Sequence, residues 1–335
     1  MKAASAARQR RIDEAPPVTD ETDIGSVGAA HVPVMVGVVV EWLRPRPGAR
    51  LVDATVGLGG HAAALLDAAP GVSLLGLDVD PQALARAGAR LASAASRVVL
   101  RRASYADLGR VLAELGWDGA DGILLDLGVS SLQLDDAARG FSFRADGPLD
   151  MRMGPGAARS AEEIVNTWPE EELARLISEF GEERRARAIA RAIVRARPLA
   201  STRMLAAVVE RVVGRAKPGI HPATRTFQAL RIAVNDELAA LDRFLADGLE
   251  VLRPGGRLAI LAYHSLEDRR VKETFRRWAA DCICPPGVVQ CVCGWRARVR
   301  ELTRRPLMPA PAEVAANPRA RSARLRVVER LEQAP

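Results

Sequence analysis

A glycine-rich segment constrains the fold of this chain more than any other feature, and it runs Asp53-Ala-Thr-Val-Gly57-Leu-Gly59-Gly60-His61. Leu51 and Val52 precede it as the end of a buried strand, and a helical pattern follows it. A tight strand-to-helix turn without Cβ atoms lets a ligand approach the backbone closely. The next apolar run ends in Asp78, where an acid is placed to accept hydrogen bonds from ribose hydroxyls. The pair predicts a nucleotide-type cofactor at the carboxyl edge of a parallel sheet.

Two cofactor classes fit such a turn, a nicotinamide dinucleotide and S-adenosylmethionine. The spacing of Gly57, Gly59 and Ala62 approaches the dinucleotide fingerprint. However, Asp53 closes the first strand, where dinucleotide-binding folds continue apolar into the turn. S-Adenosylmethionine has no phosphate but carries a sulfonium cation and an amino-acid end, so nearby carboxylates attract it. The residues therefore favour a methyltransferase over a dehydrogenase, with a tight turn that binds no ligand as the third interpretation.

Two further strand ends extend the expected cofactor site. Tyr105 follows the third predicted strand, where its ring is placed to lie along an adenine face, unless it is an ordinary half-buried tyrosine. The fourth predicted strand ends at Asp126, and ligands of open α/β sheets gather at the carboxyl ends of strands. Asp126 and Gln133 are therefore expected at the boundary between cofactor and substrate, with a simple capping role for Asp126 as the alternative.

The pattern along the chain predicts an α/β sheet that is interrupted by an all-helical segment. Short apolar runs alternate with helical periods in the first part, which indicates a parallel sheet covered on both faces. The expected strands are residues 50–54, 72–77, 97–101, 122–127 and 257–262, with an antiparallel pair at 299–303 and 323–329. The expected helices are residues 61–68, 81–92, 108–115, 173–180, 183–197 and 202–214.

These elements divide the chain into three predicted parts. Residues 1–30, rich in Ala, Asp, Glu and Pro, are expected to form a disordered leader. Residues 31–134 and 233–330 are expected to form one discontinuous sheet domain. Its opening segment, His31 to Leu43, is expected to pack on the sheet. Residues 135–232 are expected to form the helical insertion and to recognise the substrate.

The chain carries an excess of positive charge, with a formal net charge of +7. Such an excess favours a polyanionic partner, although many basic proteins bind none, and a genome rich in G and C also enriches Arg. On the predicted helix 183–197, four arginines share one face and form a candidate phosphate-binding stripe. They are Arg184, Arg187, Arg191 and Arg195. A solvated helix face is the alternative interpretation.

The location expected for this chain is the cytoplasm. No secretory signal is visible, and the longest apolar stretch is shorter than the roughly 20 residues that a membrane-spanning helix needs.

All four cysteines lie close together, as Cys282-x-Cys284 and Cys291-x-Cys293. In a reducing compartment this clustering suggests a structural zinc ion on four thiolates, although C-x-x-C is the usual spacing. Free thiols or opportunistic disulfides are the alternatives.

Several blocks of the sequence are too long to be expected together by chance. They are Asp126-Leu-Gly-Val-Ser-Ser131, Gln133-Leu-Asp135-Asp136, Arg139-Gly-Phe-Ser-Phe143, Asp146-Gly-Pro-Leu-Asp-Met-Arg-Met153, His221-Pro-Ala-Thr-Arg-Thr-Phe-Gln228, His264-Ser-Leu-Glu-Asp-Arg269 and Asn317-Pro-Arg-Ala-Arg-Ser322. Together they resemble the bacterial ribosomal RNA small subunit methyltransferase H family (MraW/RsmH), across about residues 30–330. The N-terminal 30 residues and the cysteine-containing stretch lie outside the shared blocks.

The resemblance implies methylation of the exocyclic N4 amine of a decoding-centre cytosine in 16S rRNA, with S-adenosylmethionine as donor. It also implies a class I S-adenosylmethionine-dependent methyltransferase (Rossmann-like) sheet with an inserted all-helical domain. The cofactor positions carried over by motif are Gly59, Gly60, His61, Asp78, Tyr105, Asp126 and Gln133. Tyr105 departs from the Phe that is commoner in the family, an exchange that preserves stacking.

The chemistry of the amine suggests two catalytic candidates. Cytosine N4 is a poor nucleophile because its lone pair is delocalised into the ring, and an acceptor for an N4 hydrogen localises that pair as the new bond forms. We expect Asp126 or the carbonyl groups after it to accept this hydrogen, with service to the cofactor as the alternative. His264 follows a predicted strand and is the second candidate, with a purely structural histidine as the alternative.

Other functions stay open on the residues alone. One is an amino-methyltransferase acting on DNA or protein, and another is a non-catalytic RNA-binding protein that retains the fold. The intact Asp53, Asp78 and Asp126 speak against the second. The expected partner is 16S rRNA in the small ribosomal subunit, and neither DNA nor a membrane is expected as a partner.

Overall fold

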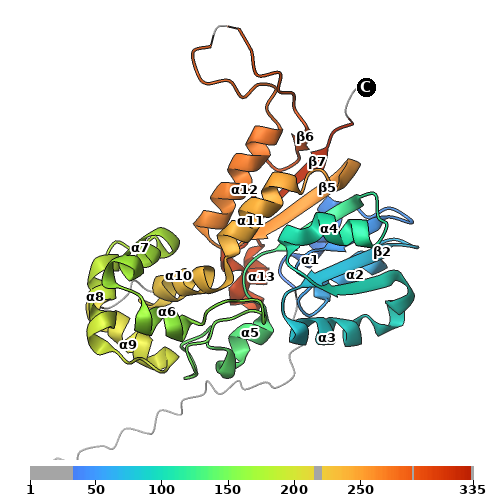
Figure 1. Ribbon diagram of the computed structural model, residues 1–335. Helices are drawn as coiled ribbons and strands as arrows, with labels where there is room; N and C mark the ends of the chain where they lie inside the picture. The colour runs from blue at the N-terminus through green and yellow to red at the C-terminus, as the bar shows by residue number, and fades with distance from the viewer. Residues whose placement is uncertain (1–32, 215–220, 289, 333–335) are drawn as a thin grey trace, which may run out of the picture. The chain divides into compact units, whose positions relative to one another are not determined.

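A seven-stranded sheet organises the computed structural model, which describes residues 33–214, 221–288 and 290–332. The strand order is β3-β2-β1-β4-β5-β7-β6 (Figure 1). The first five strands run parallel, and β7 is antiparallel to both β5 and β6. The strands are β1 Arg50–Asp53, β2 Ser73–Asp78, β3 Val98–Arg102, β4 Ala120–Asp126, β5 Leu252–Ala262, β6 Val299–Glu301 and β7 Arg324–Arg330.

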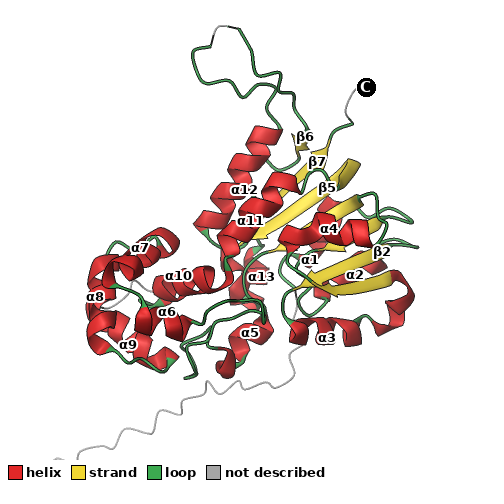
Figure 2. Cartoon of the chain, viewed as in Figure 1, coloured by secondary structure: helices red, strands yellow, loops and turns green. Residues whose placement is uncertain are grey.

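Helices cover both faces of this sheet (Figure 2). Successive strand residues alternate between two apolar clusters, as period-two side chains must. Leu51 and Leu124 pack in the cluster with α1, α2 and α3, whereas Val52 and Leu125 pack in the cluster with α4, α11 and α12. These helices are α1 Val36–Leu43, α2 Gly60–Asp67, α3 Pro81–Arg90, α4 Leu108–Glu114, α11 Glu237–Asp247 and α12 Ser265–Trp278. The predicted packing of the opening segment on the sheet is confirmed for α1, whose Val39 and Leu43 lie in the same cluster as Leu51 and Leu124.

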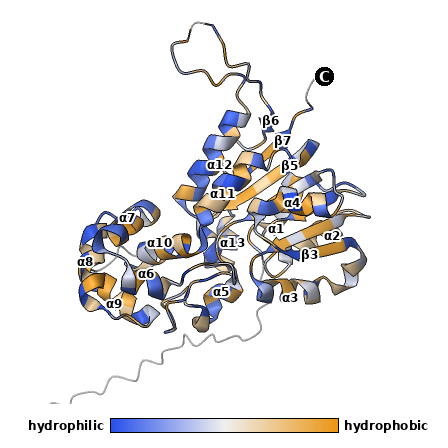
Figure 3. Cartoon of the chain, viewed as in Figure 1, coloured by the Kyte–Doolittle hydropathy of each residue, from blue (hydrophilic) through white to orange (hydrophobic). Residues whose placement is uncertain are grey.

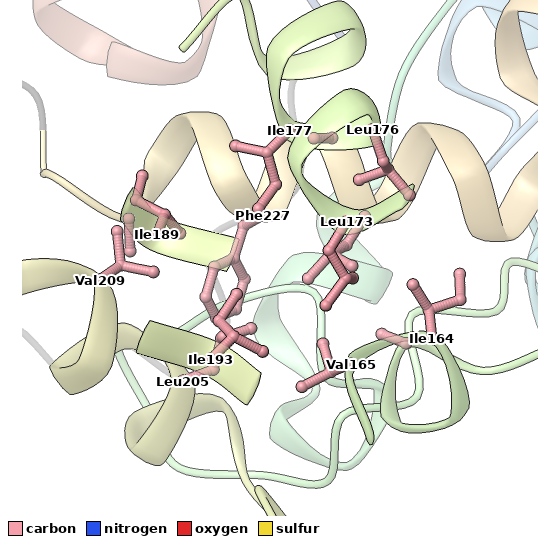
Figure 4. Packing of buried hydrophobic residues seen from close by; sticks show 14 of the residues in the cluster. Ile164, Val165, Leu173, Leu176, Ile177, Ile189, Ile193, Leu205, Val209 and Phe227 are labelled. Carbon is pink, nitrogen blue, oxygen red and sulfur yellow. The ribbon is translucent and has the colours of Figure 1, made fainter. Parts of the chain in front are cut away.

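A separate apolar cluster lies among the helices between β4 and β5 (Figure 4). Leu173, Leu176 and Ile177, predicted to share one helix face, are buried in it, and Ile189 and Ile193 join them. The helices here are α5 Ser131–Asp135, α6 Ala161–Thr167, α7 Glu170–Gly181, α8 Ala186–Ala196, α9 Thr202–Val213 and α10 Thr224–Asn235. The fold class predicted from the sequence, an α/β sheet with an all-helical insertion, is confirmed.

The chain leaves the helical cluster at Asp236, which has a left-handed backbone with φ 50°. Residues of α10 before it pack in the helical cluster, and residues of α11 after it pack mainly in a sheet cluster. Sequence patterns pointed to neither α10 nor α12. Sequence reasoning also placed the start of β5 too late, because Leu252 already pairs with Ala120 across a register irregularity.

One helix boundary predicted from the sequence is wrong. The helix expected over residues 183–197 begins only at Ala186, so Arg184 lies in the turn before it. Glu182 has a left-handed backbone, and the Glu183 carboxylate accepts a hydrogen bond from the Arg185 backbone N–H, which fixes the later start. Arg184 therefore does not share the helical register of the other three arginines.

Hydropathy follows the layers of the structure (Figure 3). Strands β2 and β5 are largely apolar, whereas α12 carries a mainly hydrophilic sequence. Across the described ranges, no helix has both the length and the apolar content that a membrane crossing requires. The leader expected over residues 1–30 lies outside the described residues.

Candidate functional site

Three carboxylates end three neighbouring parallel strands. Asp53 is the last residue of β1, Asp78 of β2 and Asp126 of β4. Strand β1 lies between β2 and β4, so Asp53 occupies the middle position. The two outer carboxylates both act electrostatically on Asp53 and contribute to its raised pKa. The clustering of acids that the sequence predicted at the carboxyl edge is therefore present in the structure.

Asp53 is the most deeply buried of these acids, with 1% of the residue exposed. Its Oδ1 accepts a hydrogen bond from the Thr55 backbone N–H at 3.3 Å, whereas Oδ2 has no hydrogen-bond partner among the described residues. Burial raises the pKa of Asp53 from 3.8 to about 7, against an opposing effect of His61. A buried carboxylate oxygen without a partner is costly, so this position fits a cationic or proton-donating ligand group.

The glycine turn is shaped both by its backbone conformation and by close packing. Gly57 and Gly59 have left-handed φ values of 50° and 74°. A Cβ on Gly60 would lie only 2.2 Å from the Pro33 side chain, and one on Gly59 would lie 3.3 Å from the backbone of α3. Packing against Pro33 and α3 thus favours glycine at positions 59 and 60, independently of whether a ligand approaches the turn closely.

Asp78 holds this turn in place. Its Oδ2 accepts a hydrogen bond from the Gly57 N–H, and its Oδ1 accepts one from the Asp80 N–H, both at 2.9 Å. Burial raises the pKa of Asp78, and these two backbone hydrogen bonds oppose that effect. Each carboxylate oxygen has a second lone pair, so Asp78 can still accept hydrogen bonds from a ribose.

His61 and Asp126 face each other at the site. His61 Nε2 lies 2.9 Å from the Val34 carbonyl oxygen, and its Nδ1 lies 3.6 Å from Asp126 Oδ2. Asp126 Oδ1 accepts a hydrogen bond from the Tyr263 hydroxyl at 2.7 Å, and the Asp126 N–H donates to Thr55 Oγ1. Burial and then the nearby Asp126 raise the pKa of Tyr263 well above its usual value, so its hydroxyl stays protonated as a donor.

Tyr263 is a site residue that sequence reasoning missed. It follows β5 directly, just before His264, and strand β5 lies beside β4. The available signal was its position at the end of the fifth parallel strand, where Asp126 ends the adjacent strand.

Gln133 is buried, and both the oxygen and the nitrogen of its side-chain amide make hydrogen bonds within the protein. Its Oε1 accepts a hydrogen bond from the Ser130 N–H, and its Nε2 donates to Asp80 Oδ2 at 3.1 Å. The same Asp80 oxygen accepts a hydrogen bond from Arg139 at 2.9 Å. Gln133 therefore connects the start of α5 to the N-terminus of α3, beside Asp78. The sequence placed Arg139 in one of the shared blocks but did not predict that Gln133 and Arg139 meet at Asp80.

Tyr105 and His264 lie around the start of α11. The Tyr105 hydroxyl donates to the Glu237 carbonyl oxygen at 3.2 Å, and its ring meets Phe244 edge-on. His264 caps α12, where Nδ1 accepts from the Glu267 N–H and Nε2 lies 3.2 Å from a Glu267 carboxylate oxygen. This capping role supports the structural interpretation of His264. Arg231 holds the Glu237 carboxylate through two contacts of 2.8 Å, which disfavours a metal ion bound between Glu237, His264 and Glu267.

The arginines of α8 project from the helical insertion. Arg187, Arg191 and Arg195 are exposed, and the opposite residues of α8 are buried as predicted. Arg191 lies 3.3 Å from a Glu170 carboxylate oxygen, so its charge is partly balanced. Arg187 and Arg195 make no ion pair with any residue that the structure describes.

The four cysteines gather on the loop between α12 and β6, and none of them forms a disulfide with another described residue. Pairs of their Sγ atoms lie 3.4 to 4.0 Å apart. Hydrogen bonds from the backbone N–H groups of Ile283 and Trp295 lower the pKa of Cys293 to about 6. A thiolate is the form of cysteine that binds metal.

Comparison with known proteins identifies close relatives of the chain. The sequence profile of the MraW methylase family matches residues 28–331. A ribosomal RNA small subunit methyltransferase H from Thermomicrobium roseum is 53% identical over 309 residues, which cover 91% of this chain and 95% of that protein. The protein of the same name from Syntrophotalea carbinolica is 54% identical over 307 residues, covering 90% and 98%. The one from Nitratidesulfovibrio vulgaris is 53% identical over 310 residues, covering 90% and 96%.

The Asp53→Asn variant should reveal the buried carboxyl as a stability difference that depends on pH. Because the pKa of Asp53 is raised from 3.8 to about 7 in the folded protein, the wild type loses stability as the pH rises through that range. The variant lacks this loss. From about pH 5 to pH 8, the difference in free energy of unfolding, variant minus wild type, should therefore rise by about 3 kcal/mol. Urea unfolding at both pH values measures the gap, with Asp67→Asn at an exposed position of α2 as control. A gap independent of pH would contradict the prediction.

Proposed function

Because the chain belongs to the MraW methylase family, we propose that it transfers a methyl group from S-adenosylmethionine to the N4 amine of a cytosine in 16S rRNA. As a family member it is an S-adenosylmethionine-dependent methyltransferase of small-subunit ribosomal RNA. The base, the atom and the residues that act on them are the finer part of the proposal. A ribosomal substrate also favours a cytoplasmic location.

The observation that carries the proposal is the group of carboxylates at three adjacent strand ends, with Asp53 Oδ2 buried and without a partner among the described residues. S-Adenosylmethionine offers two cationic centres and no phosphate, so this charge pattern suits it and disfavours a dinucleotide. The proposed contacts follow the sequence motifs. The backbone of Gly59 and Gly60 and the side chain of His61 approach the amino-acid end, Asp78 binds the ribose, Tyr105 packs on the adenine, and Asp126 and Gln133 close the site.

S-Adenosylmethionine, when bound, supplies a methyl group that its positive sulfur already activates. The protein therefore has to orient the amine and accept its hydrogen. Asp126 is suited to this role because 24% of its side chain is exposed, in contrast to 1% of Asp53. A target base inside folded RNA must be splayed out to reach a carboxylate at a strand end. In this proposal Asp126 touches the substrate, and the capping residue His264 keeps a supporting role.

Two other functions compete with this one. An amino-methyltransferase that acts on DNA or protein would use the same carboxylates, and a non-catalytic RNA-binding protein would have no need of a buried acid without a partner. The identity to small-subunit rRNA methyltransferases over nine-tenths of the chain favours the rRNA substrate.

Methyl transfer from labelled S-adenosylmethionine tests the substrate and the atom together. We expect label in 16S rRNA of small subunits, on one cytosine, with mass spectrometry of the nucleoside locating the methyl on N4. Free DNA and total protein serve as competing acceptors, and label in either would replace the proposal by its alternative. Asp126→Asn should lower turnover at saturating cofactor by about 10²-fold or more, and should lower cofactor affinity by much less, because the asparagine amide keeps a polar group at the site. Unchanged turnover would remove Asp126 from the chemistry.

We further propose that α8 contacts rRNA phosphates through its exposed arginines. Because Arg191 is already paired with Glu170, the double variant Arg187→Glu and Arg195→Glu is the sharper test. It should weaken rRNA binding by about tenfold. The slope of log affinity against log salt concentration should become less steep by about 1.5, as expected for two lost phosphate contacts. The control is Arg86→Glu with Arg90→Glu, the same charge change on exposed positions of α3. Equal RNA affinity of both double variants and the wild type would discard the α8 contact.

A structural zinc ion on the four cysteines is the last part of the proposal. Four sulfurs at about 2.3 Å from one zinc ion lie about 3.8 Å from each other, because these are the edges of a tetrahedron. The sulfur separations of 3.4 to 4.0 Å agree with that geometry. Backbone N–H groups of Ile283, Cys284 and Trp295 donate to sulfur atoms and would stabilise thiolates. These contacts favour a bound metal over free thiols or disulfides.

Metal analysis of protein purified without metal columns or chelators should find about one zinc ion per chain. Cys291→Ser with Cys293→Ser should lower the zinc content to near zero. Val292→Ser, at the 82% exposed position between them, should keep it. Metal-free protein with four freely reactive thiols, or with disulfides detected by mass spectrometry, would overturn the zinc assignment.

A further inference from the structure

The contacts of His61 settle where its proton sits when the ring is neutral. Its Nε2 lies 2.9 Å from the Val34 carbonyl oxygen, which can only accept a hydrogen bond. Nε2 must therefore carry the hydrogen, and Nδ1 is left with a lone pair. That lone pair faces Asp126 Oδ2 across 3.6 Å, a distance longer than a hydrogen bond and consistent with two acceptors facing each other. A proton placed between these atoms would convert this contact into a charge-assisted hydrogen bond.

Resting on the proposed function, we propose that His61 accepts, through Asp126, the proton that the substrate amine loses during methyl transfer. Methylation of a primary amine to a secondary amine releases one proton per turnover, and nothing in the donor takes it up. As the N–CH₃ bond forms, the S–CH₃ bond breaks with its electron pair kept by sulfur, and one N4–H bond breaks with its pair kept by nitrogen. The proton moves to an Asp126 oxygen and then to His61 Nδ1.

Neighbouring groups favour the imidazolium that forms. Asp126 faces it from β4, and Asp53, which couples electrostatically to His61, faces it from β1. Tyr263 donates to Asp126 Oδ1, and Asp78 acts on Asp53 from β2. His61 is 6% exposed and the Asp126 side chain 24% exposed, so Asp126 is also the route by which the proton returns to solvent after product release.

The competing interpretation is that His61 only supports the cofactor or the fold. It does support the fold, because its Nε2–H anchors α2 to the carbonyl group of Val34. His61→Gln separates these roles, since the amide N–H of glutamine can donate to the same carbonyl group while offering no basic nitrogen. A loss of cofactor affinity with a normal rate at saturating cofactor would indicate support alone, whereas a slow methyl transfer at saturating cofactor indicates proton transfer. His61 acts through Asp126 and is thus a positioning and proton-accepting residue that does not touch the substrate.

The first test reads the proton directly and needs no activity. Nitrogen-15 NMR of histidine-labelled protein without ligands distinguishes the two neutral tautomers and the imidazolium. The His61 signals are assigned by their absence in His61→Gln, or, should that variant not fold, by elimination with variants of the other three histidines. We expect the neutral ring to carry its hydrogen on Nε2. A proton on Nδ1 in the resting protein, as either neutral tautomer or cation, would overturn the proposal.

The second test measures single-turnover methylation of small subunits at saturating S-adenosylmethionine, beside calorimetric binding of its demethylated product. His61→Gln should slow methyl transfer at saturating cofactor by about 10²-fold to 10³-fold, within the usual range for acid–base groups, and lower the affinity by much less, because the glutamine amide keeps a polar group near the amino-acid end. The control is His221→Gln, the same substitution at a position paired with Glu210 in the helical insertion. A wild-type rate in His61→Gln would overturn the relay alone. Absence of methylation by the wild type would instead overturn the proposed function, and the NMR result would stand apart from it.

Discussion

The rest of this structure depends on the burial of negative charge at three adjacent strand ends. Removing Asp53 from water while Asp78 and Asp126 stand on either side of it is costly, and only a proton or a cation offsets that cost. The raised pKa of Asp53, about 7, is the direct expression of this conflict. The same charge explains both parts of the proposed chemistry. It favours a sulfonium donor with an ammonium end, and it stabilises a proton on His61 once the amine has lost it.

Strand register makes this cluster concave. Asp53 pairs with Gly76 on one side and with Leu124 on the other, so Asp78 and Asp126 each lie two residues further along their strands. At about 3.3 Å per residue the outer acids extend roughly 6 to 7 Å beyond the central one. This offset accounts for the difference in exposure between Asp53 and Asp126.

Sequence patterns predicted the sheet, the helical insertion and the acids at the strand ends, because each of these follows from local periodicity and from the rule that parallel strands end on one edge. They did not predict Tyr263, since its importance arises from pairing between β4 and β5, which are far apart in the sequence. Nor did they predict that Gln133 is engaged by Asp80 and Ser130. Arg184 was misplaced for a local reason, because a left-handed residue at Glu182 is not visible in an apolar repeat. The assignment of the cofactor-contacting residues as a set stays a prediction.

Opposite charges on the two parts of the fold also constrain how RNA can be bound. The arginines of α8 attract phosphates, whereas the three carboxylates at the strand ends repel them. A nucleotide can therefore approach Asp126 through its uncharged base while its phosphates stay with the helical insertion. Two contacts keep the insertion beside the sheet helices. Arg231, in the last turn and a half of α10, is half-buried and holds Glu237 of α11 bidentately. Glu182, the residue after α7, accepts hydrogen bonds from Ser265 and Arg269 of α12. In the proposed function, this charge separation favours a base that is flipped out of the RNA helix.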